Sequence, residues 1–246
     1  MFMHGLNAIF KRELLSYFAT PLAYVFLAIF IFASGAFTFY IGAFFERGQA
    51  NLSSFFTWHP WLFLFLIPAV SMRLWAEENK TGTIELMLTL PVKQWHMVAG
   101  KFLAAWLFAS VAVIMCTVPM WITVSYLGDP DHGVIAASML GSMLMAGGYL
   151  AIGACISSLT NNQVIAFVVS ITVCFLFTLS GFPLVLNFFN SFLPSIATDI
   201  IANLSFLRHF SSITKGVVEI SSLIYFLTFI TLWLSINTYV LSSRRA

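Results

Sequence analysis

The residues most able to make specific polar contacts lie in one short, charged segment near the middle of the chain. It begins at Glu77 and contains the run Gly82-Thr-Ile-Glu85-Leu-Met-Leu-Thr-Leu before Pro91. Gly82 can serve as a helix N-cap, and Glu85 then lies in the first turn, where the helix dipole favours an acid. Pro91 ends the helix, because the residue before a proline is pushed out of the α region. The pattern predicts a helix of about eight residues over 83–90, apolar nearly all round.

A helix this short is not stable alone in water, so it must be buried against something. One interpretation is a plug that inserts into a cytoplasmic partner. The other is a helix that lies in the lipid interface and simply connects two membrane spans. The physics of the segment alone leaves both open.

The sequence offers little other chemistry. A nucleotide-binding P-loop is missing, because the only Gly-Lys pair, Gly100-Lys101, has Trp95 at the position of the first required glycine and is followed by Phe102. If ATP drives this protein, another polypeptide binds it.

The cysteines and histidines do not form a site by spacing. Cys116, Cys155 and Cys174 lie in apolar runs, and their odd number without a CxxC pattern argues against a disulfide framework and a zinc site. His59, beside Pro60, could line a cavity, although such a histidine is more often satisfied by a backbone carbonyl. We therefore expect no metal, no bound cofactor and no catalytic residue in this chain.

The amino-acid composition indicates whether the chain is surrounded by water or by lipid. The chain has 246 residues, of which 60% are hydrophobic and 8% charged, whereas soluble domains carry roughly 25% charged residues. Most of the surface must therefore face lipid, and a net charge of +2 is too small to indicate nucleic acid. We predict an all-α integral membrane protein.

Windows of about 20 apolar residues mark membrane spans. Six are predicted, at 22–45, 54–75, 102–127, 134–159, 164–186 and 221–242. Residues 4–18 have apolar side chains at helical spacing and two basic residues off that stripe, which predicts an amphipathic helix in the interface. Residues 187–220 are too apolar for a water-exposed loop, so we expect short helices that dip into the outer leaflet.

The distribution of lysine and arginine predicts the orientation. Of the 11 Lys and Arg residues, eight lie on the side that holds both termini and the loop 77–96, and that side is therefore predicted to be cytoplasmic. No predicted span holds a charge at mid-depth, so an ion-driven mechanism lacks the carboxylates it would need. Energy is then supplied from outside the membrane.

The fourth predicted span has small residues at every fourth position, namely Ser138, Ser142 and Ala146. Small residues let helices approach closely. We interpret them mainly as packing within the chain, and otherwise as part of a dimer interface or pathway wall.

Together these residues resemble a known family. The run Glu77-Glu78-x-x-x-Gly82-Thr83-Ile84-Glu85-Leu86, followed by Leu90-Pro91 and Gly100-Lys101, is similar to the signature loop of ABC-2 type transporter permeases. The runs Arg47-Gly-Gln-Ala, His59-Pro60-Trp61 and Met72-Arg-Leu-Trp-Ala-Glu resemble the gliding-motility-type subfamily, to which permeases of the nitrous-oxide-reductase maturation system are close. The resemblance covers essentially the whole chain.

The resemblance implies an ABC-2, type V exporter-like fold whose short helix is a coupling helix docked on a separate cytoplasmic ATPase. The docking residues would be Glu77, Glu78, Gly82, Thr83, Ile84, Glu85, Leu86, Met87 and Pro91. It also implies a second permease copy or a paralogue, two ATPases that carry the ATP and Mg²⁺, and no enzyme activity in this chain. The lack of a targeting extension is compatible with a bacterial inner membrane.

Two other classes of function stay open. One is mechanotransmission, in which nothing crosses the membrane and the segment 187–222 contacts an outer-side partner protein. The other is a membrane enzyme that modifies lipid, which the scarcity of clustered polar groups argues against.

Overall fold

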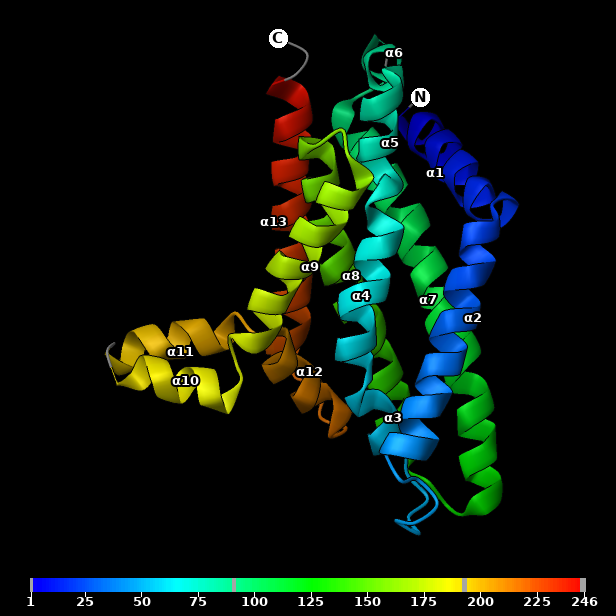
Figure 1. Cartoon of the computed structure of the whole chain (residues 1–246), viewed down its shortest axis with the longest axis vertical. Helices are drawn as coiled ribbons and strands as arrows, with labels where there is room; N and C mark the ends of the chain where they lie inside the picture. Colours follow the sequence, from blue (N-terminus) through cyan, green and yellow to red (C-terminus); the bar gives the residue numbers. More distant parts are fainter. Residues whose placement is uncertain (1, 90–91, 192–193, 244–246) are drawn as a thin grey trace.

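The computed structural model describes residues 2–89, 92–191 and 194–243, and every regular element among them is helical (Figure 1). In chain order the helices are α1 (Phe2–Ala19), α2 (Pro21–Ala36), the π-helical turn η1 (Phe37–Ile41), α3 (Ser53–Thr57), α4 (His59–Ser71), α5 (Arg73–Thr81), α6 (Thr83–Thr89), α7 (Gln94–Leu127), α8 (His132–Leu159), α9 (Gln163–Leu179), α10 (Pro183–Asn190), α11 (Ser195–Asn203), α12 (Phe206–Thr214) and α13 (Ile220–Ser243). The all-α prediction is confirmed.

Four stretches are long and apolar enough to cross a membrane by themselves: 23–41, α7, α8 and α13. The pair α9 and α10, bent by 73° at the break between them, is a fifth candidate. The predicted second span, 54–75, is divided at Trp58 and Met72 among α3, α4 and the start of α5, and α4 has only 13 residues. Length and composition thus support four to five spans, and the count of six stays a prediction.

The division at Met72 is mild. Met72 keeps right-handed helical angles, φ −56° and ψ −27°, and its N–H donates to the carbonyl of Pro68 at 2.9 Å. The chain therefore runs on from α4 into α5 with little change of direction, as Figure 1 shows.

Two helix ends do not coincide with the predicted span bounds, which stay predictions. The first span was predicted to reach residue 45, but the helical backbone ends at Ile41, and Ala43 has a left-handed φ of 48°. The third was predicted to begin at 102, whereas α7 begins at Gln94. The sequence pattern placed Lys101 outside the membrane-spanning helix because it is charged, yet its charge is balanced by carboxylates in the folded chain.

Helix α8 lies at the centre of the bundle, and α4, α5, α7, α9, α12 and α13 all pack against it. Its central position depends on small side chains, since Ser138, Ser142 and Ala146 are all buried. At Gly153 a Cβ would lie 1.9 Å from the Ser71 hydroxyl of α4, so only glycine fits there. Close packing of α8 therefore fixes where α4 and its continuation α5 lie.

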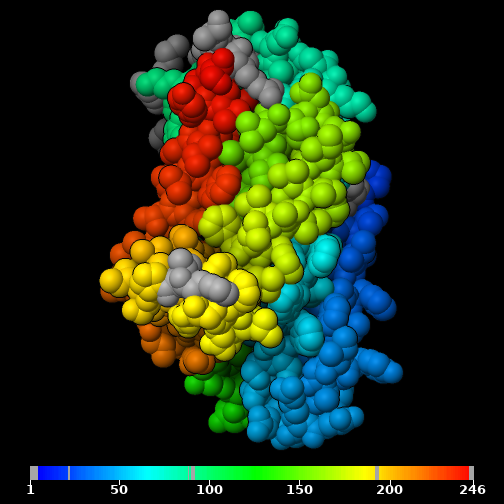
Figure 2. Space-filling model, turned by 60° about the vertical axis from the view of Figure 1, so that its left-hand side comes forward, coloured from blue at the N-terminus to red at the C-terminus, as the bar shows by residue number. Residues whose placement is uncertain are grey.

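The segments 4–18 and 187–220, predicted as an interfacial helix and as short outer-leaflet helices, are also largely helical. Helix α1 packs along α7 near Gly100, where an added Cβ would lie 3.0 Å from Ile9. In the segment 187–220, α12 packs on α8 through buried Phe206, Phe210 and Ile213. The α10–α11 hairpin, yellow in Figures 1 and 2, projects sideways from the bundle.

Candidate functional site

The candidate site is the junction between α5 and α6, at the end of the bundle where α1 and the last turn of α13 also lie (Figure 1). Helix α5 ends at Gly82, whose φ of +73° lies in the left-handed region that favours glycine. The Gly82 carbonyl accepts from the Glu85 N–H at 3.3 Å, so the same residue closes α5 and opens α6. A helix is present where the loop pattern predicts one, with Glu85 in its first turn.

Helix α6 has two different faces. Ile84 and Met87 are buried against the chain, whereas Thr83, Glu85 and Leu86 are exposed, and Leu86 is 71% exposed. The rest of the chain therefore buries only one face of α6, although the sequence predicts that the helix is buried. Leu90 and Pro91 lie outside the described residues.

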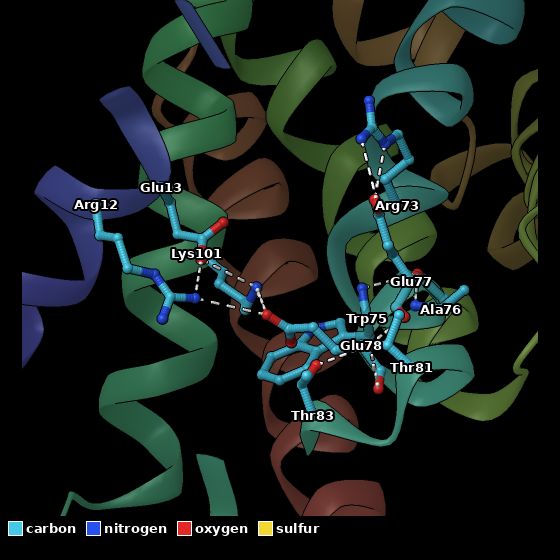
Figure 3. Close-up of polar contacts among 11 residues, drawn as sticks. Arg12, Glu13, Arg73, Trp75, Ala76, Glu77, Glu78, Thr81, Thr83 and Lys101 are labelled. Atoms are coloured by element: carbon cyan, nitrogen blue, oxygen red, sulfur yellow. Dashed lines mark hydrogen bonds and ion pairs between the residues drawn. The ribbon is translucent and has the colours of Figure 1, made fainter. Parts of the chain in front are cut away.

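Glu77 and Glu78, predicted to dock a partner, point to partners in their own chain. The Nε of Arg73 donates to Oε2 of Glu77 at 2.9 Å, one helical turn away on α5. Oε1 of Glu78 lies 2.7 Å from Nζ of Lys101 on α7. The two neighbouring carboxylates thus contact different parts of the structure (Figure 3).

Lys101 is the centre of a four-residue charge cluster formed by Arg12, Glu13, Glu78 and Lys101 (Figure 3). Its side chain is only 3% exposed, and Nζ also donates to Oε1 of Glu13 at 3.2 Å. Arg12 reaches the same Glu13 oxygen at 2.9 Å. The ring of Trp75 lies 5.1 Å from the ammonium, within the range of a cation–π contact.

The cluster holds two positive and two negative side chains, so its formal charge is zero. The pairs of Lys101 with Glu13 and Glu78 are little exposed, whereas Arg12 is 62% exposed. Removal of Lys101 therefore leaves two little-exposed carboxylates without their buried partner. Burial raises the pKa of the Glu78 carboxyl, and the Lys101 ammonium opposes that shift. The cluster therefore ties α1, α5 and α7 together mainly through Lys101, which contacts a carboxylate from each of the other two helices.

Hydrogen bonds fasten α5 to α8 on its other side. The Ser157 hydroxyl accepts from the N–H groups of Trp75 and Ala76, at 3.1 and 3.0 Å, and donates to the Met72 carbonyl at 2.8 Å. Asn79 donates to the Thr160 carbonyl at 2.9 Å. Helix α5, which carries α6, is thereby attached to three other helices, α1, α7 and α8.

His59 is part of the core. It is buried on α4, its Nδ1 lies 2.8 Å from the Ser142 hydroxyl, and Phe30, Phe55 and Phe63 surround its ring. Its partner is thus a hydroxyl where the sequence argument favoured a carbonyl. Among the described residues no group of three His, Cys, Asp or Glu could hold a metal ion.

Sequence reasoning did not find Glu13, Lys101 or Ser157 as members of this site. Glu13 and Lys101 are 88 positions apart, and Ser157 lies 81 to 85 positions from its partners at residues 72, 75 and 76. Neither local spacing nor hydropathy carries such a signal. The one available hint is that Lys101 stands at the start of a long apolar run. A lysine that is buried there requires a carboxylate nearby.

Taken together, the long apolar helices define a multi-pass integral membrane protein, with a braced helical junction at one end of the bundle. Residues 49–241 match the family described as ABC-2 family transporter protein, and that match covers most of the chain. The protein belongs to this family and is the membrane component of an ABC-2 family transporter. A comparison with curated proteins finds no match.

Proposed function

We propose that this chain is the permease subunit of an ATP-driven ABC-2 exporter, coupled through α6 to a separate cytoplasmic ATPase that holds the ATP and Mg²⁺. The observation that carries the proposal is the exposed face of α6, formed by Thr83, Glu85 and Leu86. Helix α5, which precedes α6, is held in place by contacts with α1, α7 and α8. An exposed leucine on a short helix whose other face is held by the chain suits insertion into a hydrophobic groove of a partner. The family match supports an ATPase partner.

The finer features of the proposal follow from the sequence. They are six spans with both termini cytoplasmic, a dimer of identical or paralogous permeases, the gliding-motility-type subfamily and a bacterial inner membrane. The third to fifth predicted spans are free of charged residues, and the chain lacks a P-loop, which supports an energy source outside the chain.

Mechanistically, closure of the ATPase dimer pushes on α6. Because α5 continues α4 and is bonded to α8 and α7, the push is passed to those helices as a rigid-body movement. The pathway opens outward as they shift.

The test is copurification of the tagged chain from its native host in a mild detergent, followed by ATPase assays. Glu85→Arg and Leu86→Asp change exposed residues, so expression should be unchanged and Tm should fall by at most a few degrees, the loss at Glu85 reflecting its favourable place in the first turn of α6. ATPase recovery should fall and coupled ATPase activity should be lost. Glu46→Arg, an exposed glutamate remote from α6, is the matched control. Normal ATPase recovery and coupling in both α6 variants would refute docking through α6.

Mechanotransmission is kept as a second candidate because of the α10–α11 hairpin. It projects from the bundle, and α10 buries none of its residues in this chain. Crosslinking from Leu184 in cells separates the two: capture of a specific outer-side protein during ATP turnover, with no substrate moved, favours mechanotransmission over export.

A further inference from the structure

A cavity of about 80 Å³ lies between α1 and the α4–α5 junction. Polar side chains from both sides line it, among them Glu13, Ser16, Tyr17, Thr20, Arg73 and Glu77. It is separate from the exposed face of α6.

The polar groups of this cavity have unused bonding capacity. Both contacts of Glu13 use Oε1, and its Oε2 makes no hydrogen bond among the described residues. Arg73 uses Nε and Nη2 for Glu77, which leaves Nη1 without a partner in the described structure. The Ser16 hydroxyl is likewise unpaired there. The cavity therefore offers carboxylate oxygens and guanidinium and hydroxyl donors together.

The cavity also lies where the apolar surface begins. The apolar helix α2 starts at Pro21, directly after Thr20 of the cavity wall. Leu15 and Phe18 of α1 are exposed near it in the sequence, and Phe65 is exposed on α4. A molecule with a polar headgroup and apolar chains places the headgroup in the polar cavity and the chains on the apolar surface beside it, as lipids at a membrane interface do.

We propose that this cavity binds the headgroup of an amine-bearing zwitterionic phospholipid, phosphatidylethanolamine, from the membrane leaflet at this end of the bundle. The ammonium group would donate to Glu13 Oε2 and Glu77, and the phosphate would accept from Arg73 Nη1 and the Ser16 hydroxyl. Hydrogen bonds between charged groups of this kind are the strong ones.

The charge pattern distinguishes this lipid from its alternatives. An anionic headgroup can reach Arg73 but brings no ammonium group for Oε2 of Glu13, the carboxylate oxygen that the chain leaves without a donor. A choline headgroup is cationic but has no N–H to donate, and its three methyl groups need more room. Charge complementarity therefore selects the primary amine. The proposal does not depend on the ATPase, so its failure would leave the proposed function standing.

The test uses the full chain purified in detergent, with thermal stability and native mass spectrometry as readouts. Phosphatidylethanolamine, phosphatidylcholine and phosphatidylglycerol with the same acyl chains are added in turn. We expect phosphatidylethanolamine alone to be retained and to raise Tm. Glu77→Gln should weaken its retention roughly tenfold through loss of a charged acceptor, while Glu46→Gln should not change it.

Ser16→Trp is a second variant, because it fills the cavity from an exposed position of α1 and leaves every ion pair in place. It should abolish selective retention even if Glu77→Gln folds poorly. Equal retention of the three lipids, preference for phosphatidylglycerol, or full retention by Ser16→Trp would each overturn the proposal. Equally tight binding of water-soluble glycerophosphoethanolamine would overturn its assignment to a membrane lipid.

Discussion

Replacement of Lys101 by methionine tests whether the charge cluster holds α1, α5 and α7 together. Methionine keeps most of the volume and the apolar contact with Trp75, so the change removes mainly the ammonium. Glu78 then loses its contact at 2.7 Å, and the two carboxylates share only Arg12, which lies 2.9 Å from Glu13 and 3.7 Å from Glu78 and is largely exposed. Removal of one partner from a buried pair costs about 3–5 kcal/mol.

The loss of stability caused by Lys101→Met depends on pH. Burial already raises the pKa of Glu78, and loss of Lys101 raises it further. A carboxyl whose pKa is higher in the folded state supports folding fully below its unfolded pKa, and that support is lost as pH rises through the folded pKa. The deficit of Lys101→Met should therefore grow from mildly acidic to alkaline pH.

The assay is thermal unfolding in detergent, followed with a thiol-reactive dye. Cys116, Cys155 and Cys174 are free and buried, so they react as the chain opens. The expected fall in Tm near pH 8 is on the order of 10 °C. Lys80→Met removes an exposed ammonium from α5 and should shift Tm very little.

The double variant Lys101→Met with Glu78→Gln sharpens the test. It has no carboxylate at position 78 that lacks its lysine, so its Tm should be higher than that of Lys101→Met alone and should depend less on pH. If Lys101→Met unfolds within about 2 °C of Lys80→Met, or if the double variant shows the sum of the two single losses, the cluster does not act as a compensated unit.

Substitutions at Gly153 and His59 test the packing, and one at Gly82 tests the backbone of the junction. Gly153→Ala should cost about 1–3 kcal/mol because its Cβ would lie 1.9 Å from the Ser71 hydroxyl, while Gly35→Ala, with open space around it, should have little effect on Tm. His59→Phe should keep or raise Tm because Nε2 of His59 is buried without a partner, whereas His59→Ala should lower stability by about 3 kcal/mol through the cavity it leaves; a large loss in His59→Phe would contradict a purely structural role. Gly82→Ala should cost about 1 kcal/mol for its left-handed backbone alone, and an unchanged Tm would show that the junction relaxes freely.

The sequence predicts those parts of the fold that depend on local pattern. Apolar windows mark α7, α8 and α13, and the glycine at 82 marks the break before α6. Small side chains indicate close packing along α8, although they do not identify its neighbours. Each of these features is set by residues within a few turns of one another.

The rest depends on contacts between distant segments. Lys101 lies just before the predicted third span because an apolar window excludes a charged residue, and only the fold brings Glu13 and Glu78 to it. Helix α7 begins at Gln94 and so includes Lys101. A hydropathy pattern treats each charge alone, so it cannot recognise one that the folded chain neutralises.

The pair Glu77-Glu78 shows how this affects the candidate site. Successive residues of an α-helix point about 100° apart, so two adjacent acids cannot share one face of α5. Glu77 contacts Arg73 along its own helix, and Glu78 contacts Lys101 on α7. A variant at Glu78 therefore changes the support of the junction, and lost ATPase binding in it would not distinguish docking from stability. Glu85 is exposed and shares no contact with the cluster, so a loss of docking there can be assigned to the surface of α6.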